Sequence, residues 1–208
     1  MSYITPELYV LRHGQTDYNL KKVVQGAGID SILNETGLGQ ANAFFEQYKN
    51  EEFDAIYSSQ LQRTYQTVRP FEQKKYEIRQ VEALNEMNWG IHEGKRPDGE
   101  MNKSYRIVTG AWRAGDFSRS VEEGQSPLEI QLLLKDFFIN LHQLKYNKIL
   151  LCSHGRTSRI LLCTLLNRSL SEMRTFRHGN TGLYKLQAVD GSYELTLEND
   201  LSHLEISN

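Results

Sequence analysis

Three of the six histidines in this 208-residue chain, His13, His154 and His178, are followed directly by glycine. The first two also close short apolar runs, ELYVL and KILLCS, that are typical of buried strands. Ligands of α/β proteins bind beyond the C-terminal ends of the strands, so we expect His13 and His154 to lie at one site. The glycine after each histidine would let a ligand approach the backbone.

The triplet Arg12-His13-Gly14 recurs at residues 177–179, and position separates the two copies. The first copy ends an apolar strand and opens a polar loop. The second lies between LSEMRTF and a C-terminal hairpin, where Gly179 is expected to end a helix. The sequence therefore predicts that His13 carries chemistry and that His178 is not catalytic.

Two arginines accompany these histidines. Arg12 adjoins His13, and Arg63 follows a third strand-like run, FDAIYSS. Guanidinium groups pair with two phosphate oxygens at once, so two arginines and two imidazoles indicate an anion pocket. Taken alone, Arg63 would as readily form a surface salt bridge.

The loop ALNEMNWGIHEGK supplies a candidate acid. Glu86 follows an apolar pair, and partial burial there would favour the protonated carboxyl that a general acid requires. We expect Glu93 to form hydrogen bonds within the loop. His92 lies between glycines and is expected to be exposed.

Strand and helix patterns alternate along most of the chain. Helical spacing marks residues 36–50, 60–69 and 156–167. The strongest helix signal spans Ser126–Lys145, where Ser126, Pro127 and Glu129 form an N-cap, a first-turn proline and a capping box. Two alternating runs around Asp190-Gly191 predict a hairpin.

This order predicts an α/β fold, a three-layer α/β/α sandwich whose mostly parallel central sheet has an antiparallel edge. The chain is 39% hydrophobic and long enough for one sizeable core. We therefore expect a single domain over residues 1–208.

The composition disfavours several classes of partner. The 24 Lys and Arg are balanced by 26 Asp and Glu, so neither nucleic acid nor a membrane is expected to bind. Cys152 and Cys163 lie in apolar runs, as expected of reduced cysteines. No run approaches the roughly 20 apolar residues of a membrane span and no leader pattern opens the chain, which predicts a cytoplasmic location.

Residues Lys95–Arg119 lack a clear pattern. The segment contains Gly99 and Gly110 and has six basic against three acidic residues. We expect it to be irregular, and either to cover the site or to be an ordinary solvated segment.

Four motifs taken together resemble the histidine phosphatase superfamily in its phosphoglycerate-mutase-like branch. They are LRHGQTDYN, SSQLQRTYQT, LNEMNWGIHEG and CSHG, and the segment QGAGIDSILNETGLGQA is similar to the family's stretch after the first loop. Each motif is weak alone, but their order spans most of the chain.

The resemblance implies a phosphomonoesterase that requires neither metal nor cofactor. His13 would attack phosphorus to give a phosphohistidine, with its other ring nitrogen held by an acceptor, and Glu86 would protonate the leaving alcohol. The phosphoryl oxygens would be bound by Arg12, Arg63 and His154, with Asn19 and the Gly155 amide as further donors. Thr16, Gln25 and Gly26 would shape the pocket wall. Such an array supplies the positive charge that phosphoryl transfer needs.

Two departures bear on the reaction. Gln125 stands where many members of the family have a glutamate, and the span Gly94–Gly124 is short for a glycolytic mutase. The short span favours a phosphatase over a cofactor-dependent phosphoglycerate mutase. The same residues would also suit an alpha-ribazole phosphatase, and the same fold could serve as a non-catalytic binding module.

The expected partner is a small phosphorylated metabolite, whose identity the sequence does not specify. Tyr18, Trp89 and Trp112 are candidates for an apolar wall of the pocket, although aromatic residues near loops also pack in cores. The oligomeric state is not readable from the sequence.

Overall fold

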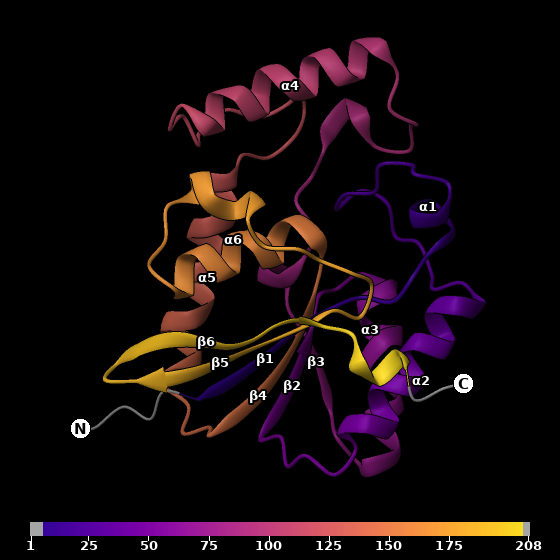
Figure 1. Cartoon of the computed structure of the whole chain (residues 1–208), viewed down its shortest axis with the longest axis vertical. Coiled ribbons are helices and arrows are strands. Elements are labelled where there is room, and N and C mark those ends of the chain that lie inside the picture. Colours follow the sequence, from indigo (N-terminus) through magenta and orange to yellow (C-terminus); the bar gives the residue numbers. More distant parts are fainter. Residues whose placement is uncertain (1–5, 206–208) are drawn as a thin grey trace.

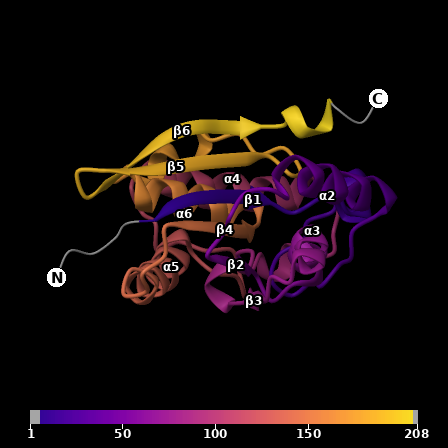
Figure 2. The same cartoon turned by 90° about the horizontal axis from the view of Figure 1, so that it is seen from below.

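A six-stranded sheet with the order β3-β2-β4-β1-β5-β6 forms the centre of the computed structural model, which describes residues 6–205 (Figure 1). The strands are β1 (Glu7–Arg12), β2 (Ala55–Ser58), β3 (Ile78–Gln80), β4 (Lys148–Ser153), β5 (Leu183–Val189) and β6 (Ser192–Asp200). The first four strands run parallel, whereas β5 pairs antiparallel with β1 and β6 pairs antiparallel with β5. This arrangement confirms the predicted mostly parallel sheet with an antiparallel edge, which Figure 2 shows from below.

Six α-helices accompany the sheet in the described range. They are α1 (Asp17–Leu20), α2 (Glu35–Tyr48), α3 (Gln62–Val68), α4 (Gly99–Arg113), α5 (Pro127–Leu141) and α6 (Gly155–Leu165), with short 3-10 turns between them. The capping box of α5 is present, because the Ser126 hydroxyl accepts from the Glu129 amide and the Glu129 carboxylate accepts from the Ser126 amide.

The alternation of side chains along β1 divides the core into two layers. Leu8 and Val10 pack with apolar residues of α5 and α6, whereas Tyr9 and Leu11 pack with α2 and α3 on the opposite face. All four residues are almost completely buried. The sheet therefore has helices on both faces, as predicted for a three-layer α/β/α sandwich.

The parallel strands bring the predicted site residues to one edge of the sheet. Arg12 pairs with Ser153 across β1 and β4, and Ser58 pairs with Cys152 across β2 and β4. His13, Ser59 and His154 come directly after these strands, so they emerge side by side at the carboxyl edge.

The structure corrects the predicted elements in three places. The long helix that was expected to reach Lys145 ends at Leu141, and the short strand Ile78–Gln80 was not anticipated. The segment expected to be irregular contains the fifteen-residue helix α4. Its signals are an Asp98 N-cap and the i, i+4 pair Val108 and Trp112, the apolar residues that this otherwise polar helix buries.

No helix in the described range 6–205 is long and apolar enough to cross a membrane.

Candidate active site

His13 is held as a neutral imidazole with one nitrogen free. Its Nδ1 donates to the carbonyl oxygen of Gly14 at 2.7 Å, which leaves the lone pair of Nε2 available. The side chain is buried, and burial together with the charges of Arg12 and Arg63 holds the pKa of His13 well below its usual value. The backbone acceptor that the sequence analysis expected is therefore present.

Arg12 has an unused donor beside His13. Its Nη1 donates to the carbonyl oxygen of His178 at 2.7 Å, whereas the buried Nε has no hydrogen-bond partner within residues 6–205. Burial lowers the pKa of Arg12, and the nearby Glu86 opposes that effect. An unpartnered buried guanidinium nitrogen is costly, so Arg12 is poised to bind an anion.

Arg63 and His154 form a hydrogen-bonded pair next to His13. The Arg63 Nε donates to His154 Nδ1 at 3.1 Å, and its other two nitrogens donate to the carbonyl oxygens of Gly26 and Ile29. Arg63 is completely buried and makes no surface salt bridge within the described part of the chain, and burial lowers its pKa to about 10. Three of its five N–H groups are used in this way, and the side chain does not reach the surface.

The His154 ring lies 5.1 Å from the His13 ring, so the predicted convergence of the two histidines is found. Because His154 Nδ1 accepts from Arg63, its Nε2 carries the proton and donates to the Ser59 hydroxyl at 2.8 Å. Burial and the neighbouring arginines keep the pKa of His154 well below normal. Its expected contact with a phosphoryl oxygen stays a prediction, and it would require one of these bonds to be exchanged.

Glu86 is anchored at the N-terminus of α6. Its Oε1 accepts from the amides of Met87 and Thr157 and from the Thr157 hydroxyl, whereas within residues 6–205 Oε2 accepts only from the Arg156 amide, at 3.1 Å. The residue is 8% exposed, in agreement with the burial expected for it. Arg156 and Thr157, which follow the CSHG motif directly, were not predicted as site residues from the sequence.

The two glycines that follow the site histidines have different roles. A side chain on Gly14 would place its Cβ 2.7 Å from the carbonyl oxygen of Gly37. The absence of a side chain at Gly14 therefore lets the His13 loop pack closely against the first turn of α2, and does not serve the approach of a ligand. At Gly155 the corresponding atom would lie 3.7 Å from Arg12 Nε and 3.9 Å from Glu86 Oε2. Gly155 therefore keeps the space between Arg12 and Glu86 open.

Of the predicted wall residues Thr16, Gln25 and Gly26, only Gln25 lines the cavity, and the predicted phosphate donor Asn19 lines it as well. Thr16 is buried behind them, caps α1 with Asn19 and hydrogen-bonds to Gln25. Gly26 contributes its carbonyl oxygen to Arg63. Asn180 completes the support by donating to Asn19 Oδ1 and to the backbone oxygen of His13.

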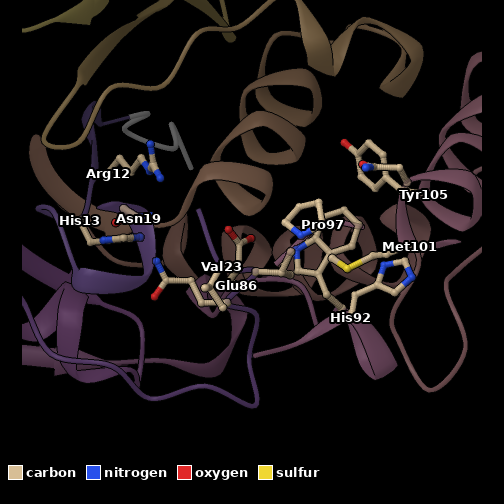
Figure 3. A pocket seen from close by; sticks show the side chains of 13 residues that line it. Arg12, His13, Asn19, Val23, Glu86, His92, Pro97, Met101 and Tyr105 are labelled. Atoms are coloured by element: carbon tan, nitrogen blue, oxygen red, sulfur yellow. The ribbon is translucent and has the colours of Figure 1, made fainter. Parts of the chain in front are cut away.

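These groups open into a cavity of about 350 Å³ (Figure 3). Figure 3 shows Arg12 and His13 on one side, His92, Met101 and Tyr105 on the other, and Glu86 between them. Sequence reasoning missed most of the far side, which is formed by residues after β3, by Pro97 and by α4. The segment Lys95–Arg119 thus contributes to the site.

Three loop predictions are tested by the burial and contacts of the side chains. His92 is buried in a 3-10 turn and lines the cavity together with residues of α4, although exposure was expected. Of the three candidate wall aromatics only Trp89 lines this cavity, because Trp112 packs behind it and Tyr18 lies at another surface. Glu93 does hydrogen-bond within the loop, as expected, by accepting from the Trp89 amide.

Gln125 supports the acid loop without contacting Glu86. The side-chain oxygen of Gln125 accepts from the backbone amide of Asn88, and the backbone amide of Gln125 donates to the backbone carbonyl oxygen of Asn88, both at 2.9 Å. A neutral amide satisfies this pair of bonds.

The second Arg-His-Gly triplet differs from the first in its surroundings. Gly179 does not end a helix, because the nearest 3-10 helix stops at Arg174, and its amide donates to Asn199 Oδ1. The ring of His178 packs 4.9 Å from that of Tyr184, and its buried nitrogens have no partner in the described chain. His178 touches the site through its carbonyl oxygen, which accepts from Arg12.

The buried histidines predict a loss of stability in acid. Burial keeps the pKa values of His13, His154 and His178 well below 6.5, so the unfolded chain takes up protons that the folded chain does not. The free energy of unfolding is therefore expected to fall between pH 7 and pH 5, by up to about 1.4 kcal/mol per pH unit for each of these sites. Urea unfolding at pH 7, 6 and 5 measures the slope. His178→Gln should make the dependence of the unfolding free energy on pH shallower, and an unchanged slope would contradict the lowered pKa of His178.

The fold and the site together define an α/β protein with a cationic pocket around a neutral histidine at the carboxyl edge of its parallel strands. The family described as Histidine phosphatase superfamily (branch 1) matches residues 8–201, so the chain belongs to this superfamily, as the motifs indicated.

Relatives of known name include both phosphatases and mutases. Phosphoserine phosphatase 1 of Hydrogenobacter thermophilus is 28% identical over 180 residues, which cover 82% of this chain and 81% of that protein. A 2,3-bisphosphoglycerate-dependent phosphoglycerate mutase of Bartonella henselae is 29% identical over 167 residues, which cover 76% and 80%.

Among solved structures, this chain is similar to a phosphoserine phosphatase of Entamoeba histolytica. A mutant of that enzyme in complex with phosphoserine superposes with a TM-score of 0.84 at 27% identity, over 96% of this chain and 100% of that one. The same phosphatase in complex with 3-phosphoglyceric acid gives a TM-score of 0.83. These related structures bind small phosphorylated metabolites.

Proposed function

We propose that this protein is a phosphatase that hydrolyses small phosphomonoesters through a phosphohistidine on His13, as a single catalytic domain. The observation that carries the proposal is the state of His13, which is buried and neutral, with Nδ1 donating to Gly14 and Nε2 free beside the unpartnered Nε of Arg12. A free imidazole nitrogen next to a guanidinium donor is suited to attack a phosphorus atom whose oxygens that donor binds.

In the first step, Nε2 of His13 forms a bond to phosphorus as the bond to the ester oxygen breaks. Arg12 and the two remaining N–H groups of Arg63 would neutralise the phosphoryl oxygens. Protonated Glu86 would transfer its proton to the departing oxygen. Oε2 is suited to this step, because it accepts a single hydrogen bond and lies across Gly155 from Arg12.

In the second step, water attacks the phosphohistidine and gives its proton to the Glu86 carboxylate. The phosphorus–nitrogen bond breaks, inorganic phosphate leaves and neutral His13 is restored. We propose hydrolysis over transfer between phosphoglycerate isomers because the wall formed by the short span Gly94–Gly124 leaves a cavity of about 350 Å³ that admits water.

Hydrolysis should persist without metal, because arginines supply the positive charge at the proposed site. Purified protein is expected to release phosphate from p-nitrophenyl phosphate at an unchanged rate in excess EDTA. Vanadate should inhibit competitively, since it adopts the five-coordinate geometry of the transferring phosphoryl group. Activity that EDTA removes and a divalent ion restores would contradict the proposal.

A further inference from the structure

The cavity has a charged inner end and an uncharged outer wall. The inner end contains Arg12, His13 and Glu86 with the side-chain amides of Asn19 and Gln25. The outer wall consists of eight residues from three stretches of the chain: Val23, Val24, Trp89, His92, Pro97, Met101, Asn102 and Tyr105. A phosphomonoester bound with phosphorus at His13 must place its alcohol portion against this outer wall (Figure 3).

None of these eight side chains carries a formal charge at neutral pH. Histidine is the one member that titrates near that pH, and burial with the nearby Lys95 lowers the pKa of His92. Asp98 opposes Lys95 at this position. The polar groups that the wall offers are therefore neutral: an imidazole, the Asn102 amide and the Tyr105 hydroxyl.

A buried cation, Arg156, lies behind this wall and is not among the residues that line the cavity. The Arg156 guanidinium lies 5.4 Å from the ring centres of both Trp89 and Trp112. Its Nη2 donates to the Tyr105 hydroxyl at 2.9 Å and its Nη1 to the Met173 sulfur. Arg156 thus fixes the aromatic wall and leaves the Tyr105 hydroxyl proton free to donate to a ligand.

We infer that the outer wall selects phosphomonoesters whose alcohol portion is uncharged and apolar or aromatic, and that it rejects those bearing a carboxylate or a second phosphate. The inference rests on the proposed function. An ionised carboxylate moved into this wall would lose hydration without gaining a cationic partner among the eight wall side chains, whereas a ring would pack on Trp89, Met101 and Tyr105. A cavity of about 350 Å³ leaves room for one or two rings beyond the phosphoryl group.

This selectivity would distinguish the protein from its structural relatives. The Entamoeba histolytica phosphatase is known in complex with phosphoserine and with 3-phosphoglyceric acid, and both compounds carry a carboxylate. Residues 89–105 form most of the outer wall here, and of these wall residues only Trp89 and His92 lie within one of the four family-like motifs.

The test compares benzyl phosphate with 4-carboxybenzyl phosphate, two alkyl esters that differ by one carboxylate. We expect kcat/KM of the full chain to be lower for the carboxylated ester by about tenfold or more, because its charge is left unpaired. Equal or higher kcat/KM for the carboxylated ester overturns the inference while leaving the proposed phosphatase intact. Failure to hydrolyse benzyl and p-nitrophenyl phosphate alike overturns the proposed function, and the inference with it.

A cation added to the wall should weaken the preference for the uncharged ester. Met101→Arg, in the first turn of α4, is expected to narrow the gap between the two esters by about tenfold through a new ion pair. Ile107→Arg is the matched control, because Ile107 lies on the same helix, is 59% exposed and does not line the cavity. If Met101→Arg does not fold, Asn102→Arg at a more exposed position makes the same test. The inference is overturned if neither wall variant lowers the ratio of kcat/KM between the uncharged and the carboxylated ester, or if Ile107→Arg lowers that ratio equally.

Discussion

Replacing His13 with alanine is expected to abolish both turnover and the acid-labile phosphoenzyme. The imidazole is buried, its Nδ1 is held by Gly14, and Nε2 is the free nucleophile beside Arg12. Loss of a nucleophile from a site that acts as a unit typically costs about 10⁴-fold or more in turnover. Steady-state hydrolysis of p-nitrophenyl phosphate and rapid-quench labelling with a phosphorylated substrate measure the two effects.

His178→Ala is the matched control, since it removes the histidine of the second Arg-His-Gly triplet. The Arg12 side chain bonds to the backbone oxygen of His178, and the alanine variant retains that oxygen. We therefore expect a trappable intermediate and most of the rate, with some loss of packing against Tyr184. A phosphoenzyme formed at a normal rate by His13→Ala, or a label found on His178, would require the mechanism to be abandoned.

Glu86→Gln is expected to lower turnover of alkyl phosphates by about 10²–10⁴-fold, because glutamine cannot donate a proton to the leaving oxygen. Esters with good leaving groups need less protonation and should be affected less. The comparison of benzyl phosphate with p-nitrophenyl phosphate in wild type and variant measures this difference. Equal losses on both esters would indicate that Glu86 acts only as the anchor of the α6 N-terminus.

Glu93→Gln controls for the change from carboxylate to amide in the same loop. Glu93 accepts from the Trp89 amide and does not line the cavity. Its replacement should leave the ratio between the two esters unchanged. The same purified variants are compared by urea unfolding, because glutamine at position 86 also disturbs hydrogen bonds from Met87 or Arg156.

The inner end of the site was predictable from sequence because its positions follow from strand order. His13 and His154 each come after an apolar strand, and parallel strands end at a common edge, so their rings meet at 5.1 Å. The residue types then indicated the chemistry, since a neutral imidazole with arginines fits a phosphoryl group. The N-cap of α5 and the Asp190-Gly191 hairpin are equally local signals, and both are present.

The hydrogen-bond partners within that end were not predictable. The sequence predicted that His154 and Arg63 bind an anion. In the folded chain they form hydrogen bonds to each other, to Ser59 and to two backbone carbonyl oxygens. These contacts join residues up to 95 positions apart. Residue type states which groups can donate, whereas the packing of separate elements decides where they donate.

Sequence by itself therefore determined the α/β class, the superfamily and the residue types at the inner end of the cavity, because each depends on patterns over a few residues or on motifs in fixed order. Only the tertiary structure decided the outer wall of the cavity. Helix α4 is mostly polar and meets the body through a few buried side chains, so its pattern resembled a solvated loop. Its position over Trp89 depends on contacts such as that between Tyr105 and Arg156, 51 residues apart. Such long-range contacts have no local signature, because they form only when the core has brought distant segments together.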